Sequence, residues 1–517
     1  MTKSIPLGGL VAVLLWVACV PAAADDDLRL VRAVKHGDAP AVLLSLLKAG
    51  ADVNATEGDG ATALAWASHR DSLEAAKLLI GAGANVNAGN EYGVTPLALG
   101  CINRSAAMIA TLLEAGADPN PAQSTGETPL IVCARTGASE AVKLLVARGA
   151  KVNVKEARQG HTALMRAAAG KHADVVRTLV EHGADVHARS RGGFTPLLFA
   201  SQQGDVESAR ILLAAGAGVD EAPLADVDAR RDETGTLCVS SRGGLSAAEK
   251  AISPCFLPRE NGTPLVVATA SGHEPLALFL LKNGANPDRT DAFGWTALHH
   301  AVPEGWAAIN SFYYRPFHEK TRPRDMPNLV RELISRGANP NARIEKGYSP
   351  FSKAQYAYGT SPVGATPFAL AAAAGNVNIM RILLDAGADP RLTLKDGTTA
   401  LMLAAGVGRS QDYRSAQEEA NALEAVKLTA KLGLDVNAAN AAGRTALHGA
   451  ASVGANPTIE FLAGRGADLE KADRRGLTPY GIAAGLGGNE EHADLIYEDT
   501  MAYLVKLAGK PLDGKTQ

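Results

Sequence analysis

Aromatic residues are scarce in this chain of 517 residues, at 5% of the sequence, and neither sign of charge dominates, with a net charge of −3. Nucleic-acid-binding domains usually carry a strong basic excess, so this balance argues against a nucleic-acid partner. No apolar run beyond the N-terminus is long enough to cross a bilayer, so no membrane insertion is expected. The length exceeds what one ordinary core can serve, which predicts several domains or a repeat array.

The N-terminus has the pattern of a secretory signal peptide. Lys3 precedes the apolar run LGGLVAVLLWVACV (7–20), and PAAADDD (21–27) follows it. We expect residues 1–24 to be removed, so that the mature chain begins at Asp25 and is exported, either periplasmic or secreted. The alternative is a lipid-anchored structural envelope component with Cys19 lipidated, although the bulky Trp16 disfavours it.

Cysteine is also rare, with five residues in the chain and four after the signal peptide is removed. In an oxidising compartment, four cysteines allow three pairings. Their spacing does not resemble that of a zinc site, so no metal is expected. The four residues are Cys101, Cys133, Cys238 and Cys255.

Two markers recur along the chain at an interval close to 33 residues. The first is Gly-Ala-Asp or a near relative, which begins at Gly50, Gly83, Gly116, Gly149, Gly183, Gly216, Gly284, Gly337, Gly387, Gly433 and Gly466. The second is a Thr followed by Ala or Pro and usually Leu, at Thr62, Thr95, Thr128, Thr162, Thr195, Thr263, Thr296, Thr366, Thr399, Thr445 and Thr478.

Each marker has a physical role in a pair of helices. A Thr caps a helix by accepting a hydrogen bond from an early backbone N–H, and Pro fits the first helical position. The Gly supplies the left-handed backbone that ends the second helix. One such pair cannot bury its own apolar side, whereas stacked pairs can.

The pattern resembles the ankyrin repeat, whose Thr-Pro-Leu-His signature is matched closely by TALHHA (296–301) and TALHGA (445–450). The resemblance implies an all-α solenoid of stacked helix-turn-helix units with β-hairpin-like fingers. It also implies protein–protein binding through the fingers and the concave inner helices. We interpret the chain as an exported, bacterial, multi-repeat member with about twelve units over residues 25–508 and a C-terminal tail at 509–517.

Departures from the regular interval locate the insertions, near 306–327, 343–364, 408–420 and 487–497. A further excess between Gly216 and Thr263 is close to one repeat in length, so a degenerate extra unit is considered at 221–261. Antiparallel helices in that unit would bring Cys238 near Cys255, and we predict a disulfide between them. Cys101 and Cys133 lie on successive inner helices, normally about 8–10 Å apart, so we expect them to be unpaired.

No catalytic motif is found. The chain contains neither a Gly-x-Ser-x-Gly elbow nor a phosphate-binding loop, and Cys238 has no His nearby in sequence. His299 and His448 occupy the signature position, where the ring packs and hydrogen-bonds locally. His300 and Glu304, four residues apart, form only a weak candidate metal pair. We therefore expect no enzyme activity, no catalytic residue and no cofactor.

Two insertions concentrate aromatic side chains, with nine of the 24 aromatics of the chain. Aromatics combine a large apolar area with few rotatable bonds, which suits binding anchors. We predict a protein-binding site there, with arginines as donors to an acidic partner; an equally weighted alternative is that the rings pack on the scaffold. The site residues are Trp306, Phe312, Tyr313, Tyr314, Phe317, Tyr348, Phe351, Tyr356, Tyr358, Arg315 and Arg322.

The leading interpretation is thus a non-catalytic exported scaffold for protein partners. A second function class is an enzyme whose site is built from the insertions. The inner-helix ends, His69-Arg70 and Arg135-Thr136 against Ala373-Ala374, further predict a concave face that is polar toward the N-terminus and smoother toward the C-terminus.

Overall fold

The computed structural model describes residues 28–223, 262–302, 325–346, 361–408, 415–486 and 496–514. The chain divides into two compact units, Met1–Lys151 (unit 1) and Val152–Gln517 (unit 2), which are described separately. Regular structure in the described ranges is helical, apart from isolated β-bridges between Thr56 and Thr62 and between Thr290 and Thr296.

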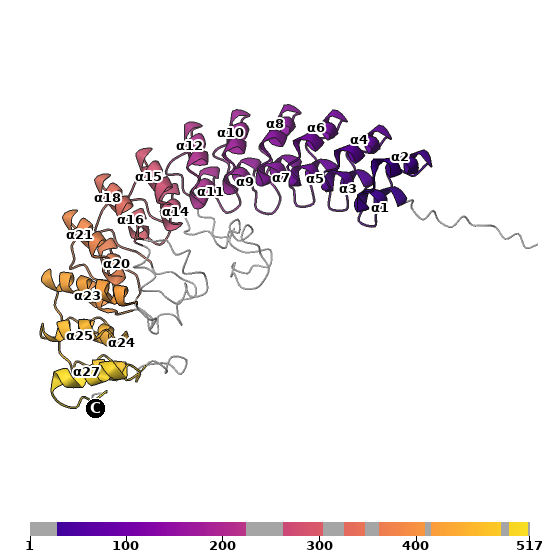
Figure 1. The fold of residues 1–517 in the computed structure, drawn as a ribbon. Coiled ribbons are helices and arrows are strands. Elements are labelled where there is room, and N and C mark those ends of the chain that lie inside the picture. The colour runs from indigo at the N-terminus through magenta and orange to yellow at the C-terminus, as the bar shows by residue number, and fades with distance from the viewer. Residues whose placement is uncertain are drawn as a thin grey trace, which may run out of the picture. The chain divides into compact units, whose positions relative to one another are not determined.

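Within the described ranges the helices form twelve pairs, numbered here as repeats 1 to 12 in chain order. Figure 1 shows successive pairs stacked along the chain. In unit 1 the pairs are α1 (Arg29–His36) with α2 (Pro40–Lys48), α3 (Ala63–His69) with α4 (Leu73–Gly81), α5 (Pro96–Ile102) with α6 (Ala106–Glu114), and α7 (Pro129–Thr136) with α8 (Ser139–Ala147). The all-α ankyrin solenoid predicted from the sequence is confirmed.

Unit 2 contains eight pairs. They are α9 (Ala163–Ala169) with α10 (Ala173–Glu181), α11 (Pro196–Gln203) with α12 (Val206–Ala214), α14 (Pro264–Ala270) with α15 (Glu274–Lys282), α16 (Ala297–His300) with α18 (Pro327–Ser335), α20 (Pro367–Ala374) with α21 (Val377–Asp385), α22 (Ala400–Ala405) with α23 (Ala416–Lys431), α24 (Ala446–Ser452) with α25 (Asn456–Ala463), and α26 (Pro479–Ala483) with α27 (Glu498–Ala508).

The marker threonines stand at the N-cap of the first helix of each described pair from α3 onward, and all but Thr445 accept a capping hydrogen bond from a backbone N–H. Thr62 Oγ1, for example, accepts a hydrogen bond from the backbone N–H of Ala65 at 3.1 Å. The Leu two positions after the Thr is fully buried, as at Leu64 and Leu97. Small residues five and six positions after the Thr, such as Ala67 and Ser68, are also buried and allow neighbouring first helices to approach closely.

A ladder of asparagine side chains connects successive repeats. In unit 1, Asn120 Nδ2 donates to the Gly149 carbonyl at 3.2 Å, and its Oδ1 accepts from the Lys151 backbone N–H at 2.8 Å. Asn54 and Asn87 bind the next repeat in the same way. Each side chain therefore satisfies one carbonyl and one N–H of its neighbour.

The stack in unit 2 continues directly across the longest sequence excess. Helix α11 packs against α14, and the Nε2 atom of His273 lies 3.0 Å from the Gln202 carbonyl oxygen. The Asp220 carboxylate accepts from the Asn286 backbone N–H at 3.0 Å. These contacts join the two repeats directly. Residues 224–261 lie outside the described ranges, so the degenerate extra unit considered at 221–261 stays a prediction.

The residues after the last helix, α27, fold back onto α26. Thr478 Oγ1 donates to the Asp513 carbonyl at 2.7 Å, and its backbone N–H donates to the Gly514 carbonyl at 3.3 Å. A Cβ atom on Gly481 would clash with Gly514, so this close approach requires glycine. Residues 509–514 of the segment treated above as a tail thus cover the start of α26.

The signature histidines are structural, as predicted. His299 Nδ1 accepts from the Thr296 backbone N–H at 3.1 Å, and its Nε2 lies 3.1 Å from the Ala342 carbonyl of the next repeat. His448 makes the matching contacts with Thr445 and Leu477. A proton on Nδ1 would face a backbone N–H, so both rings are held neutral.

We predict that unit 2 loses stability as the pH falls from about 6.5 to about 4. Burial lowers the pKa of His161, His299 and His448 to about 4 each. In the unfolded chain these histidines take up protons near pH 6.5. The unfolded state therefore binds more protons in this interval, and the free energy of unfolding decreases by up to roughly 3 kcal/mol per histidine.

Thermal unfolding of the wild-type chain and of His448→Gln, measured across this pH range, checks the prediction. The variant should lose about a third of the pH dependence, because it retains two of the three histidines. An unfolding midpoint that stays constant from pH 7 to pH 4.5 in the wild type would contradict it.

Candidate functional site

Each first helix presents one side toward the fingers, which are the loops that precede the marker threonines. Trp66, four residues after Thr62, donates its indole N–H to the finger residue Glu57 at 2.8 Å. Ile102 and Arg135 hold the position seven residues after their threonines. The inner face is defined here as the surface made by four sets of residues. They are the residues four and seven positions after each marker Thr, the residue directly before that Thr, and the finger tips.

Neighbouring fingers are held in register by backbone hydrogen bonds. The Glu91 N–H donates to the Asp59 carbonyl at 2.9 Å, and the Ser124 N–H donates to the Tyr92 carbonyl at 2.9 Å. Within its finger, Asn90 Oδ1 accepts from the N–H groups of Tyr92 and Val94. Equivalent positions of adjacent repeats therefore lie side by side on the inner face of unit 1.

Repeat 2 contributes a polar and aromatic cluster to this face. The Lys35 ammonium lies 2.8 Å from the Glu57 carboxylate and 4.5 Å from the centroid of the Trp66 ring. The His69 ring packs edge-on against Trp66, with a centroid distance of 5.5 Å. Trp66 is therefore anchored on three sides and remains half-buried.

Repeat 3 differs because it exposes apolar side chains. Tyr92 at the finger tip is 62% exposed, and Ile102 at the end of α5 is 46% exposed. Val94 and Leu99, between them on the inner face, are half-buried. In repeat 4 the face becomes charged again, because the Arg135 guanidinium lies 3.8 Å from the Glu127 carboxylate.

This finding corrects the prediction of a polar concave face toward the N-terminus. The prediction rested on the helix ends His69-Arg70 and Arg135-Thr136. Ile102, at the helix end of the repeat between these two, is apolar and exposed. The signal was present in the sequence, since Ile102 holds the same position as His69 and Arg135.

The inner face of unit 2 is largely closed. At the fourth position after the Thr, five consecutive repeats have side chains that are at most 4% exposed. The same position in unit 1 holds the half-buried Trp66 and Leu99 in repeats 2 and 3, whereas Val132 in repeat 4 is buried. The closed positions are Phe199, Val267, His300, Leu370 and Leu403.

Buried charged and aromatic groups support two fingers of unit 2, those that precede Thr162 and Thr296. Burial raises the pKa of the Glu156 carboxyl, but backbone N–H donors of His161, Arg158 and Gln159 outweigh it, so the net shift is downward. In repeat 8, the Asp291 carboxylate lies 3.5 Å from His300 Nε2, and the Trp295 ring stacks on His300. These contacts hold the finger turns in place.

The aromatic and arginine residues predicted as the binding site all lie outside the described residues, at 303–324 and 347–360. Cys238 and Cys255, the predicted disulfide partners, also lie outside them. Both sets therefore stay predictions.

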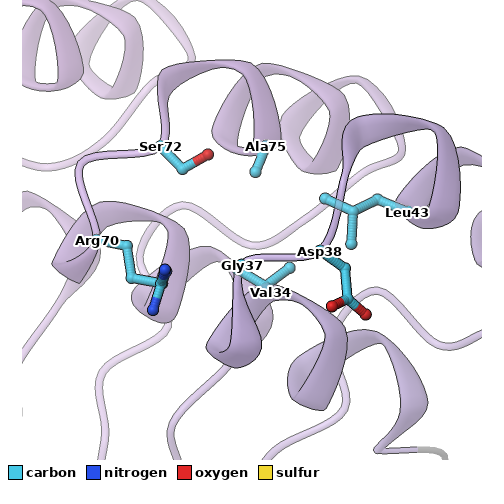
Figure 2. Close-up of a pocket in the computed structure, with 7 residues that line it drawn as sticks. All are labelled: Val34, Gly37, Asp38, Leu43, Arg70, Ser72 and Ala75. Carbon is cyan, nitrogen blue, oxygen red and sulfur yellow. The ribbon is translucent and has the colours of Figure 1, made fainter.

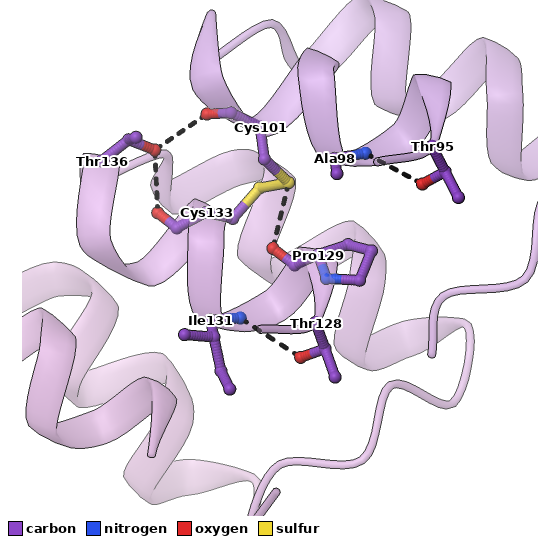
Figure 3. The surroundings of a disulfide bond; sticks show 8 residues. All are labelled: Thr95, Ala98, Cys101, Thr128, Pro129, Ile131, Cys133 and Thr136. Atoms are coloured by element: carbon purple, nitrogen blue, oxygen red, sulfur yellow. Dashed lines mark hydrogen bonds between the residues drawn. A yellow bond between two sulfur atoms is a disulfide. The ribbon is translucent and has the colours of Figure 1, made fainter. Parts of the chain in front are cut away.

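The expectation that Cys101 and Cys133 are unpaired is wrong. The two residues form a disulfide between α5 and α7, with their Cα atoms 4.6 Å apart (Figure 3). First-helix axes lie about 8–10 Å apart, but Cα atoms on facing sides are each about 2.3 Å nearer to the partner, which leaves about 4–5 Å. Both cysteines occupy the small-residue positions at which the helices face each other.

A pocket of about 300 Å³ lies between repeats 1 and 2, where first helices turn into second helices (Figure 2). Val34, Leu43 and Ala75 form its apolar part. Arg70 reaches to the Lys35 carbonyl at 3.1 Å, and its guanidinium fills the space that a Cβ on Gly37 would need. The pocket is therefore a gap between stacked repeats.

The described ranges contain no group of three or more His, Cys, Asp or Glu side chains placed to hold a metal ion. None of their helices has both the length and the apolar character needed to span a bilayer.

The geometry defines a class of protein, a helical repeat array with variable positions displayed on one face. Family models described as ankyrin repeats match residues 30–123, 130–222 and 318–414, and a further one matches 265–305. The chain belongs to the ankyrin repeat family.

Curated relatives match this chain over part of their own length. The ankyrin repeat and KH domain-containing protein mask-1 of Caenorhabditis elegans is 28% identical over 47% of this chain and 10% of its own length. The E3 ubiquitin-protein ligase KEG of Arabidopsis thaliana is 27% identical over 63% of this chain and 18% of its length. Ankyrin repeat and SOCS box protein 16 of Mus musculus is 31% identical over 43% of this chain and 47% of its own length. The chain thus spans at most about half of these relatives.

We predict that the Cys101–Cys133 disulfide stabilises unit 1. Closing a loop of this length contributes about 4 kcal/mol in the chain-entropy account. Alanine is a natural replacement, because Ala134 holds the repeat position of Cys101 and Ala67 holds that of Cys133. Replacing both cysteines with Ala should accelerate amide hydrogen exchange in α5 and α7 accordingly. Mass spectrometry of a non-reduced digest should show the two peptides linked. Alkylation of both thiols in the non-reduced, unfolded chain would contradict the prediction.

Proposed function

We propose that this chain is a non-catalytic scaffold that is exported and binds one or more protein partners through its inner face and fingers. The observation that carries the proposal is the contrast between frame and face. The capping Thr, the buried Leu and the ladder Asn recur with the repeat, whereas the inner-face positions change from one repeat to the next. Variation on a constant frame is how repeat scaffolds form binding surfaces.

Export is supported by two independent features. The N-terminal residues have the charge, apolar run and small-residue cleavage pattern of a signal peptide. The disulfide between Cys101 and Cys133 belongs with an oxidising compartment, because cytosolic thiols are kept reduced. A periplasmic or secreted location accounts for both.

The aromatic insertions are proposed as further contact sites. They interrupt repeats 8 and 9 of the array and hold a large share of its aromatic side chains, with Arg315 and Arg322 among them. Aromatic residues and arginine dominate the energetics of protein interfaces. A partner with some acidic character suits this composition.

Partner capture from the exported fraction, with chemical cross-linking, tests the proposal. Replacing Phe312, Tyr313 and Tyr314 with Ala should lower the amount of captured partner at least about tenfold, because such anchors carry much of the binding energy. The thermal unfolding midpoint should stay within about 2 °C of the wild type, since the proposal assigns these rings to the partner and not to the scaffold.

Phe461→Ala is a matched control, because this partly exposed ring lies on the second helix α25. It should leave capture unchanged. Retained capture together with a large drop in the unfolding midpoint of the triple variant would show that the three rings pack on the scaffold instead.

A further inference from the structure

The apolar residues of repeat 3 form a continuous line across the inner face of unit 1. Tyr92 lies at the finger tip, Val94 precedes the capping Thr95, and Leu99 and Ile102 follow on α5. We call these four residues the repeat 3 stripe. The two end members are among the few large apolar side chains that the described residues expose, at 62% and 46%.

Neighbouring repeats are more polar at the two exposed ends of the stripe. The finger tips on either side of Tyr92 are Asp59 and Thr125, and the helix ends on either side of Ile102 are His69 and Arg135. Between the ends, Leu99 has the apolar neighbours Trp66 and Val132. The exposed apolar ends are therefore a property of repeat 3 and not of the repeat frame, and there the apolar width is that of one repeat.

The stripe is also fixed in place. Asn103, next to Ile102, donates its amide to the Ser68 and His69 carbonyls at 2.8 and 2.7 Å. On the other side, Cys101 is joined to Cys133 of repeat 4, and Thr136 Oγ1 donates to the Cys101 carbonyl at 2.9 Å. A surface held on both sides loses little conformational entropy when a partner binds.

Charge changes sign along the stripe. The finger end carries the exposed carboxylates of Asp59 and Glu91. At the opposite end, the exposed Arg70 and Arg104 donate to the backbone carbonyls of Lys35 and Gly137, which are neutral groups. One exposed carboxylate, Asp71, follows Arg70, so the charge balance of these three residues is positive. An occupant that complements the face is basic at one end and acidic at the other.

We propose that the repeat 3 stripe binds an amphipathic helix of a protein partner, apolar along one side, with basic residues at the fingers and acidic residues at the far ends of the first helices. A helix is about 10 Å wide, which matches the distance between neighbouring first helices, so its flanks meet repeats 2 and 4. The inference rests on the proposed function and adds the chemistry of the partner.

Direct binding to the oxidised full-length chain tests the inference, with fluorescence anisotropy of synthetic probes. The main probe is a helical peptide of about four turns with leucines along one side, lysines at one end and glutamates at the other. Two comparison probes have the same leucines, with lysines at both ends or glutamates at both ends. The main probe should bind at least about tenfold more tightly than either comparison probe.

Ile102→Asp should weaken binding of the main probe at least about tenfold, because it places a charge in the apolar line. The matched control is Leu44→Asp, which changes a side chain of similar exposure, 41% against 46%, on the second helix α2. The control should bind like the wild type. Circular dichroism melting should be unchanged in both variants, since neither side chain belongs to the core.

Equal binding of the three probes, or equal binding by Ile102→Asp and the wild type, would overturn the inference. The proposed function is tested separately. If Ile102→Asp still captures the partner from the exported fraction while the main probe fails to bind, the scaffold function stands and the repeat 3 stripe is not its site.

Discussion

The structure depends on the coupling between neighbouring repeats, because no pair of helices in this chain buries its own apolar side. Coupling has an apolar part, in which first helices approach through small residues such as Ala67 and Ala134. It also has a polar part, in which ladder residues such as Asn120 satisfy a carbonyl and an N–H of the next repeat. Where Asp220 replaces the ladder Asn, only the acceptor contact remains, because a carboxylate has no proton to donate.

This coupling separates the residues that hold the array together from those that are free to vary. Thr caps, buried leucines and the ladder occupy the helix starts, the core and the outer loops. The inner-face positions are free to vary, and their exposure differs between the two units. Unit 1 exposes Tyr92 and Ile102, whereas unit 2 buries Phe199, Leu370 and Leu403 at inner-face positions. This contrast favours unit 1 as the place of the proposed protein-binding surface.

The fold was predictable because the repeat period recurs many times in the sequence, so the period remains recognisable when one marker is lost. The first repeat lacks its Thr, yet α1 and α2 form as expected. The pairing of Cys101 with Cys133 was missed for a geometric reason, since helix separation was taken from axes and not from facing Cα atoms. Ile102 was readable from its register, whereas its exposure depends on how α3 and α7 pack beside α5, which no single repeat encodes.

The central claim is that the inner face is open in repeats 2 and 3 of unit 1 and closed in repeats 6 to 10 of unit 2. Hydroxyl-radical footprinting of the full-length chain tests it most directly, because Trp66 and Trp295 are the same residue type at inner-face positions of the two units. Trp66 is half-buried, whereas Trp295 is 1% exposed. The account predicts fast oxidation of Trp66, Tyr92 and Ile102 and strong protection of Trp295 and Phe199. Similar oxidation rates for Trp66 and Trp295 in the folded protein would contradict it.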